Sequence, residues 1–287
     1  MKTLLVPVAL HDALPSVFET TRLVAQRFGS LIEGVSLRPA LAEYVPVDMV
    51  GGMTWLRDEE ADRAEAEEAG ARFIAFMDRA GIPRHARDGL CTPENVAGAG
   101  PRYRWRQDVP AGDGFLGQYA RLFSMTIVGR PGSQDASPSM ATFETALFEG
   151  GRPILLAPPT APAALGRAIL IAWNGSTETA RAVAFAMPFL HAAERVRVLS
   201  VEGGTVPGPS AEDLARALAC EGIAADHRAL PAGRRTPGET FLAEAKDFDC
   251  DLLIKGAYTQ SRLRQMIFGG PTSHLLAHAD LPVLMAH

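Results

Sequence analysis

The chain has 287 residues, of which 47% are hydrophobic and 21% charged, and its net charge is −5. This composition is typical of a globular protein, and it excludes a collagen-like chain, a coiled coil and disorder throughout. The acidic balance argues against a nucleic-acid partner, and no apolar run approaches the roughly 20 residues of a membrane span. At roughly 150 residues per domain, the length predicts two domains.

The cysteines and the apolar N-terminus predict a cytoplasmic protein. The sequence has three cysteines, Cys91, Cys220 and Cys250. An odd, sparse set without a short-range pair predicts neither a disulfide framework nor a CxxC metal site. The opening MKTLLVPVAL is interrupted by Pro7, ends at His11, and has no small-residue cleavage site after it. It is therefore predicted to be a buried strand and not a signal peptide.

In the first half of the chain, short apolar runs bounded by turn residues predict five strands. These are Leu4–Val8, Leu31–Leu37, Arg102–Gln107, Met125–Gly129 and Pro153–Ala157. In Arg102–Arg106, arginines and aromatic residues alternate, which predicts a half-exposed strand with the two kinds of side chain on opposite faces. Extra segments lie at Arg38–Leu56 and Gly81–Pro101. The first is apolar and could cover a pocket, form a partner surface or simply pack, and we favour packing.

The second half repeats the alternation of strands and helices. The predicted strands are Ala168–Trp173, Val196–Val201, Ala225–Leu230, Leu252–Gly256 and Pro282–Ala286. The predicted helices are Ser176–His191, Ser210–Cys220, Pro237–Asp247 and Pro271–Ala279. Such alternation calls for a parallel sheet that is covered by helices on both faces.

The two halves are copies of one plan. Pro153 matches Pro282 at an offset of 129, whereas Leu4–Ala9 matches Ile169–Asn174 at an offset of 165, so the first copy carries extra residues in its middle. Between the copies, the segment 157–166 has three prolines and no strand or helix period, as expected of a linker. We place the first domain at residues 1–158 and the second at residues 167–287.

Glycines follow the fourth strand of the second copy. Ligands of an open parallel sheet bind beyond the carboxyl ends of the strands, where the strand order reverses, which here means the loops after the first and fourth strands. Gly256 ends the fourth strand, and Gly269 and Gly270 precede a helix. Glycines let a backbone approach a phosphate, and a helix N-terminus offers free N–H groups. The alternative is that they only serve tight turns, and spacing alone favours this alternative.

The double copy, the α/β plan and the loop from Gly256 to Gly269 resemble the tandem universal stress proteins of the UspA family over essentially the whole chain. The resemblance implies two Rossmann-like, adenine nucleotide alpha hydrolase-like domains, each with a five-stranded parallel sheet flanked by helices. It further implies that the halves pack through their last strands as an intramolecular pseudo-dimer. The implied role is in the stress response and is more consistent with a non-enzymatic protein than with an enzyme.

Nucleotide-binding members of that family carry G-x2-G-x9-G-(S/T) after the fourth strand and usually an Asp at the end of the first. Here Thr259 stands at the second glycine and Asn174 at the Asp. The resemblance implies ATP or another adenine nucleotide as the ligand, with no metal beyond nucleotide-bound Mg²⁺. The implied binding residues are Asn174, Gly256, Ser261, Gly269, Gly270 and Thr272.

The first copy departs further from that pattern. Gly129 and Gly132 fit G-x2-G, but Thr142 stands ten residues later with no Gly-Ser after it, and Ala9 replaces the Asp. We therefore expect a degenerate loop in the first domain and any nucleotide in the second.

Other functions remain open at this stage. The chain could be a nucleotide-independent module for protein interaction that uses one of the extra segments, or it could slowly hydrolyse ATP at the same loop. A homodimer is a further partner hypothesis, whereas no nucleic-acid or membrane partner is expected. His274 and His278 share one helix face, but no third ligand stands at a fixed spacing, so we expect no metal site.

Overall fold

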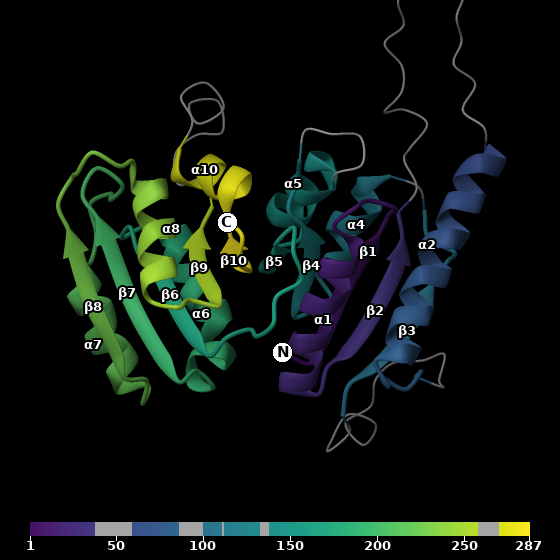
Figure 1. Ribbon diagram of the computed structural model, residues 1–287, viewed down its shortest axis with the longest axis horizontal. Helices are drawn as coiled ribbons and strands as arrows, with labels where there is room; N and C mark the ends of the chain where they lie inside the picture. Colours follow the sequence, from purple (N-terminus) through teal and green to yellow (C-terminus); the bar gives the residue numbers. More distant parts are fainter. Residues whose placement is uncertain (38–58, 86–99, 111, 133–137, 258–269) are drawn as a thin grey trace, which may run out of the picture.

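The computed structural model describes residues 1–37, 59–85, 100–110, 112–132, 138–257 and 270–287 (Figure 1). The extra segment 38–56 and most of 81–101 lie outside the described residues. At the described start of the second segment, Ile82 is buried and Arg84 forms a parallel bridge with Tyr103. This part of the segment therefore packs onto the domain.

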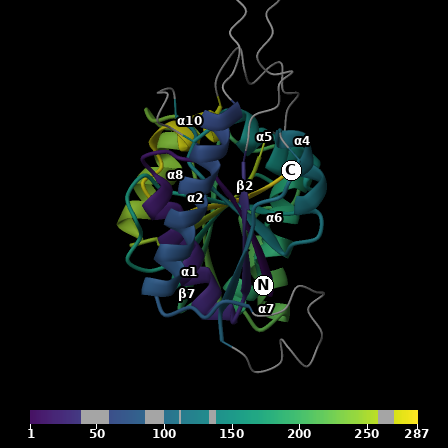
Figure 2. The same cartoon turned by 90° about the vertical axis from the view of Figure 1, so that its right-hand side faces the viewer.

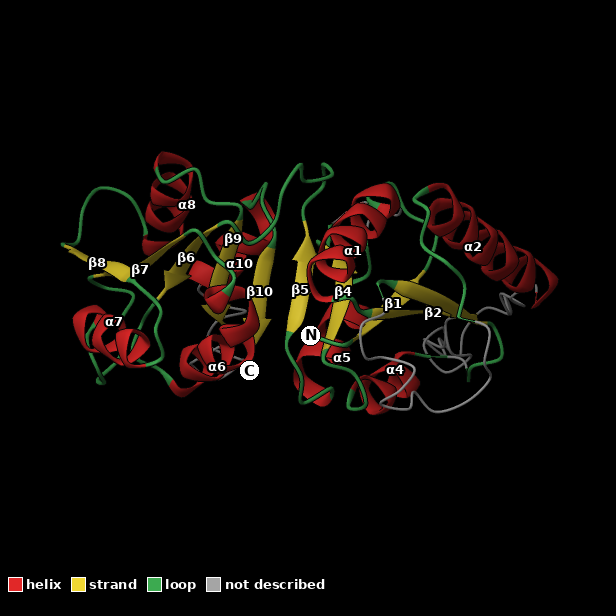
Figure 3. Ribbon diagram, turned by 90° about the horizontal axis from the view of Figure 1, so that it is seen from below, coloured by secondary structure: helices red, strands yellow, loops and turns green. Residues whose placement is uncertain are grey.

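The first half contains five strands and four helices among its described residues. The strands are β1 (Thr3–Val8), β2 (Leu31–Ser36), β3 (Arg102–Arg106), β4 (Met125–Gly129) and β5 (Ile154–Ala157). The helices are α1 (Leu14–Phe28), α2 (Glu59–Arg79), α4 (Asp113–Ala120) and α5 (Met140–Glu149). Helices α1 and α2 cover one face of the sheet, and α4 and α5 cover the other (Figure 3).

The second half has the same plan. Its strands are β6 (Ala168–Ala172), β7 (Arg195–Val201), β8 (Ala225–Leu230), β9 (Leu252–Gly256) and β10 (Val283–Ala286). Its described helices are α6 (Thr177–His191), α7 (Ala211–Cys220), α8 (Pro237–Asp247) and α10 (Pro271–His278). Helices α6 and α7 lie on one face and α8 and α10 on the other, so helices flank the sheet from both sides in the end-on view (Figure 2).

One ten-stranded sheet runs through both halves in the order β3-β2-β1-β4-β5-β10-β9-β6-β7-β8. All neighbours within a half are parallel, whereas β5 and β10, the last strands of the two halves, pair antiparallel. The predicted strands and the helices predicted in the second half are confirmed to within one residue at each end. The α/β fold class is likewise confirmed.

The edge strand β3 carries two different faces, as its alternating sequence predicted. On one face Tyr103 and Trp105 pack against Phe73 of α2, with ring centroids 5.9 and 5.5 Å from its ring. On the other face Arg104 donates to the buried carboxylate of Glu33. The arginines therefore serve the packing of this half, which explains the alternation without a nucleic-acid partner.

Candidate functional site

The strand order reverses at the centre of each half. β1 pairs with both β2 and β4, and β6 pairs with both β7 and β9, so the connections leave these central strands in opposite directions. Such switch points create a crevice at the carboxyl ends of the strands. The carboxyl ends of the first and fourth strands therefore lie side by side in each half.

In the second half, Asn174 organises the beginning of α6. Its buried side-chain oxygen accepts hydrogen bonds from the Ser176 N–H at 3.2 Å and from the Thr179 hydroxyl at 2.5 Å. The Ser176 hydroxyl in turn accepts from the Thr179 N–H as the N-cap of the helix. At this position, where the family pattern has Asp, the amide oxygen thus holds the helix N-terminus at the switch point.

Gly256 allows the end of β9 to approach the same helix. A Cβ at this position would lie 2.3 Å from the backbone nitrogen of Thr179 and 2.6 Å from the carbonyl carbon of Glu178. Only glycine fits a contact this close. Two predicted site residues, Asn174 and Gly256, are therefore brought together through Thr179 and the first turn of α6.

Lys255 is a site residue that our sequence reasoning missed. Its side chain is buried at the carboxyl end of β9, and its ammonium donates to the Gly256 carbonyl oxygen at 3.0 Å. In the sheet it pairs with Ala172, two residues before Asn174. Burial lowers the pKa of Lys255 to about 8, an effect that the charge of Glu178 partly opposes. A lysine within the apolar run LLIKG was the available signal, because buried strands rarely carry a charge.

Glu178 interacts electrostatically with Lys255, and His287 in turn interacts with Glu178. Burial raises the pKa of Glu178, but hydrogen bonds from its own backbone, Ser176 and Thr177, with the charge of His287, hold it below the usual value. One carboxylate oxygen of Glu178, Oε2, is buried and has no hydrogen-bond partner among the described residues. The ring of His287 lies 4.8 Å from that of Phe148, which belongs to α5 of the first half.

The remaining predicted residues lie on or near α10. Gly270 is the N-cap of this helix in extended conformation, without a side-chain cap, and Thr272 is buried in its first turn. Ser261 and Gly269 fall outside the described residues, so their positions relative to Lys255 stay predictions. The described contacts of the site therefore join a buried cation, a glycine and the start of α6, and Gly270 and Thr272 lie at the start of α10.

In the first half, the corresponding crevice is filled by side chains of the chain itself. A Cβ on Gly129 would lie 2.5 Å from the Pro138 ring and 3.2 Å from the His11 ring. Burial lowers the pKa of His11 to about 4, with Asp12 opposing, so His11 is neutral near pH 7. Thr142, the position of the third motif glycine, donates to Asp113 within this half. These contacts fit the expectation that the first copy is degenerate.

The two histidine rings of α10 do lie against each other, with centroids 4.4 Å apart and planes tilted by 43°. Within the described ranges, however, no three side chains of His, Cys, Asp or Glu come together in a way that could hold a metal ion. Nor is any described helix both long and apolar enough to cross a bilayer.

Residues 166–287 match the model of the Universal stress protein family. Among curated proteins, the chain is similar to the stress response protein NhaX of Bacillus subtilis, at 35% identity over 49 residues. That match covers 17% of this chain and 30% of NhaX, so it spans less than a third of the relative's length.

Solved structures with the same fold span nearly the whole chain. A universal stress protein from Archaeoglobus fulgidus has a TM-score of 0.65 at 14% identity, covering 99% of this chain and 97% of its own. A putative universal stress protein from Pseudomonas aeruginosa has a TM-score of 0.54 at 14% identity, with 100% and 93% covered. At such identities the likeness shows the fold alone, and it extends over both halves.

Proposed function

We propose that this chain, a universal stress protein family member through its residues 166–287, binds an adenine nucleotide at the switch point of its second half and acts as a cytoplasmic stress-response protein. The family indicates the role in stress response. The proposed ligand is ATP or a related adenine nucleotide with its Mg²⁺, and the proposed binding residues are those of the motif together with Lys255.

The observation that carries the proposal is the buried ammonium of Lys255 beside Gly256. A phosphate needs positive charge, free N–H groups and a close backbone approach. Lys255 supplies the charge, the N-terminus of α6 adjoins Gly256, and Gly270 starts α10 without a side-chain cap. These features fit an anionic ligand even though Thr259 and Gly270 depart from the letters of the family pattern.

The energetic cost of Lys255 supports a functional role. Transferring a charged ammonium into a protein interior is unfavourable unless it is well paired, and a lowered pKa reports that cost. Strongly perturbed groups in a crevice are enriched at functional sites. A bound phosphate would compensate for the burial and restore the ordinary affinity of Lys255 for its proton.

The first test is nucleotide content and ligand-dependent stability. Protein purified without added nucleotide is denatured, and the supernatant is analysed for adenine nucleotides. Thermal unfolding is then followed with ATP, ADP and AMP, with and without Mg²⁺. A ligand at 100 times its Kd should stabilise the fold by about 2.7 kcal/mol, which a rise in Tm reveals. Wild-type protein with no carried-over nucleotide and no shift at millimolar ligand would contradict the proposal.

Matched variants locate the site. Lys255→Met and Gly269→Asp should each abolish the ATP-dependent shift, whereas Gly132→Asp, in the corresponding loop of the first half, should leave it unchanged. If Gly269→Asp left the rate of phosphate release from ATP unchanged, slow hydrolysis at this loop would be excluded. If Gly132→Asp alone abolished the shift, the nucleotide would belong to the first half.

A nucleotide-independent interaction module is the second candidate. It is favoured by the internal role of Asn174, whose oxygen is engaged by Ser176 and Thr179, and by the filled crevice of the first half. Under this hypothesis the segment 38–56 or the segment 81–101 contacts a partner, either another protein or a second copy of the chain. Deleting either segment should then remove the partner in a pull-down while the nucleotide experiments stay negative.

A further inference from the structure

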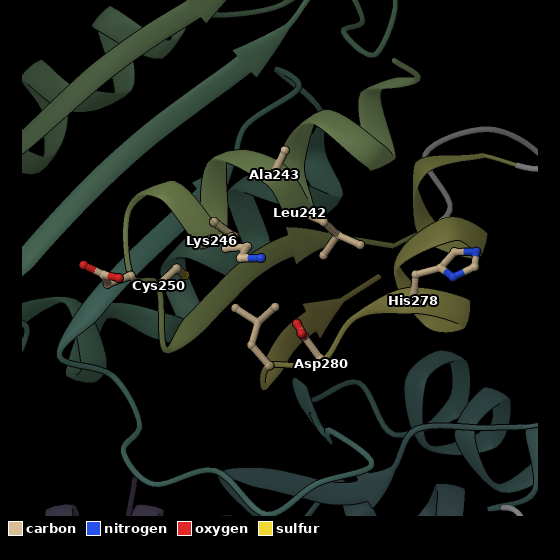
Figure 4. Close-up of a pocket in the computed structure, with 9 residues that line it drawn as sticks. Leu242, Ala243, Lys246, Cys250, His278 and Asp280 are labelled. Carbon is tan, nitrogen blue, oxygen red and sulfur yellow. The ribbon is translucent and has the colours of Figure 1, made fainter.

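A second pocket lies at the opposite end of the strands from the nucleotide site. Its volume is about 530 Å³, and it opens between the C-terminal part of α8, the end of α10 and the turn before β10 (Figure 4). Cys250 precedes β9 and Leu281 precedes β10, whereas Gly256 ends β9. The pocket is therefore separate from the residues of the proposed nucleotide site.

The base of this α8–α10 pocket is apolar. Leu242, Cys250 and Leu281 line it, and all three pack against the hydrophobic core while remaining partly exposed. Burial raises the pKa of the Cys250 thiol to about 12, so the sulfur is uncharged near neutral pH. This surface suits an aliphatic group, because contact with it removes apolar area from water on both sides.

Opposite charges stand on two sides of the apolar base. Lys246 projects from α8, and Asp280 projects from the turn before β10 toward the same space (Figure 4). Lys246 makes no ion pair within 4.0 Å in the part of the chain that the structure describes. The pocket thus presents a free ammonium at one side and a carboxylate at the other.

Carboxylates outnumber ammonium groups in the lining of the pocket. Asp249 and Asp280 both line it, beside the single lysine Lys246. The guanidinium of Arg130, which donates to the carbonyl oxygens of Ala277 and Ala279 at the end of α10, acts on Asp280 from outside this lining. A phosphate group in the pocket would face two carboxylates, which argues against a nucleotide there.

We propose that the α8–α10 pocket binds a small zwitterion with an aliphatic body, of the class of the aliphatic α-amino acids. The ligand carboxylate pairs with Lys246, its ammonium lies by Asp280, and its side chain covers Leu242 and Leu281. Each part of the pocket has a counterpart in such a molecule, whereas a fatty acid or an amine would satisfy only one of the two charges.

The test measures the binding of L-leucine and two analogues to the full chain, without nucleotide, by isothermal titration calorimetry. N-acetyl-L-leucine lacks the ammonium, and L-leucinamide lacks the carboxylate. Because each lost pair is a charge-assisted contact in a partly exposed site, each analogue should bind about tenfold more weakly than L-leucine. Equal binding of all three, or no binding of L-leucine at tens of millimolar, overturns the proposal.

Variants assign each charge to its partner. Lys246→Gln should weaken L-leucine about tenfold and abolish its advantage over L-leucinamide, because the carboxylate then has no partner. Asp280→Asn should abolish the advantage over N-acetyl-L-leucine in the same way. Asp247→Asn, an exposed carboxylate on α8 beside Lys246 that does not line the pocket, is the matched control and should change nothing. Discrimination that survives both pocket variants would place the binding elsewhere and overturn the proposal.

Discussion

The two switch points of the sheet have the same topology but different contents. In the first half, His11 and Pro138 occupy the space around Gly129, and Ala9 offers no polar side chain. In the second half, Gly256 meets the backbone of α6, and Lys255 brings a buried charge to the same crevice. A duplicated fold can therefore keep its geometry while packed side chains occupy the crevice of one copy. In the other copy the crevice holds a buried cation that costs stability.

The largest difference is expected from adding one methyl group at the two equivalent glycines. Gly256→Ala places a Cβ 2.3 Å from the Thr179 nitrogen, a backbone atom held by the α6 cap, and should destabilise the protein by about 3 kcal/mol. Gly129→Ala meets mainly the Pro138 ring at 2.5 Å, a side-chain contact and not a backbone one, and should cost about 1 kcal/mol. Urea unfolding of both variants measures the contrast, and equal losses would show that the two switch points are packed alike.

Removing the buried charge should have the next largest effect, and in the stabilising direction. The pKa of Lys255 falls from 10.5 to about 8 on folding, which corresponds to a cost of about 3 kcal/mol for the charged form. Lys255→Met should therefore stabilise the protein by about 2 to 3 kcal/mol at pH 7, in urea unfolding, while it removes ATP-dependent stabilisation.

The pH dependence tests the cause of that gain. The folded state binds the Lys255 proton more weakly than the unfolded state, so this lysine makes wild-type stability rise with pH between about 8 and 10.5. The advantage of Lys255→Met should shrink across that window, and comparing the two proteins cancels groups that both retain. A constant advantage from pH 7 to pH 10 would mean that packing, and not charge, explains the gain.

Much of this fold was predictable because its elements are local in sequence. Continuous apolar runs ended by glycine or proline define β6 and β9, and Ser210 and Thr236 cap α7 and α8 with side-chain oxygens. The family pattern located Asn174 and Gly256, which both contact Thr179. These features depend on residues within a few positions of each other or on a repeated motif.

The parts that escaped prediction depend on contacts between distant segments. His11 and Pro138 meet over Gly129 although they are far apart in the chain, and no spacing rule connects them. The α8–α10 pocket needs Lys246 and Asp280 from elements that only the packing of two helices brings together. Lys255 differs, because a charge inside an apolar strand was visible in the sequence and its significance depended on knowing that both faces of β9 are covered.

His11 should give a smaller, pH-dependent difference between the halves. Its pKa is lowered to about 4, so protonation below pH 6.5 disfavours the folded state, and stability should fall as the pH drops from 6.5 to 4. Because the side chain is partly exposed, we expect this contribution to be about 1 to 2 kcal/mol. His11→Gln should remove that part of the acid dependence in urea unfolding between pH 4 and pH 7, whereas Asn174→Gln should leave it in place because Asn174 does not titrate.

The smallest effect on stability is expected at the residue that follows Gly129 in the first copy and Gly256 in the second. This residue is Arg130 in the first copy and Ala257 in the second. Arg130 reaches across to the second half and donates to the carbonyl oxygens of Ala277 and Ala279, both at 2.9 Å, at the end of α10. The loop after β4 in the first copy thus supports a helix of the second copy, whose N-cap, Gly270, belongs to the proposed nucleotide site.

Arg130→Gln should destabilise the protein by about 1 kcal/mol, because two charge-assisted bonds at a helix C-terminus are lost from a partly exposed position. The amide hydrogens at the end of α10 should exchange faster, while those of α5 keep their rates. Arg130→Lys retains the charge without the planar guanidinium. Its stability and its exchange rates in α10 should lie between those of the wild type and of Arg130→Gln. Unchanged exchange in α10 after Arg130→Gln would show that the loop after β4 does not stabilise this helix. A change confined to α10 would show that the degenerate loop now stabilises the helix on which the proposed site of the other copy depends.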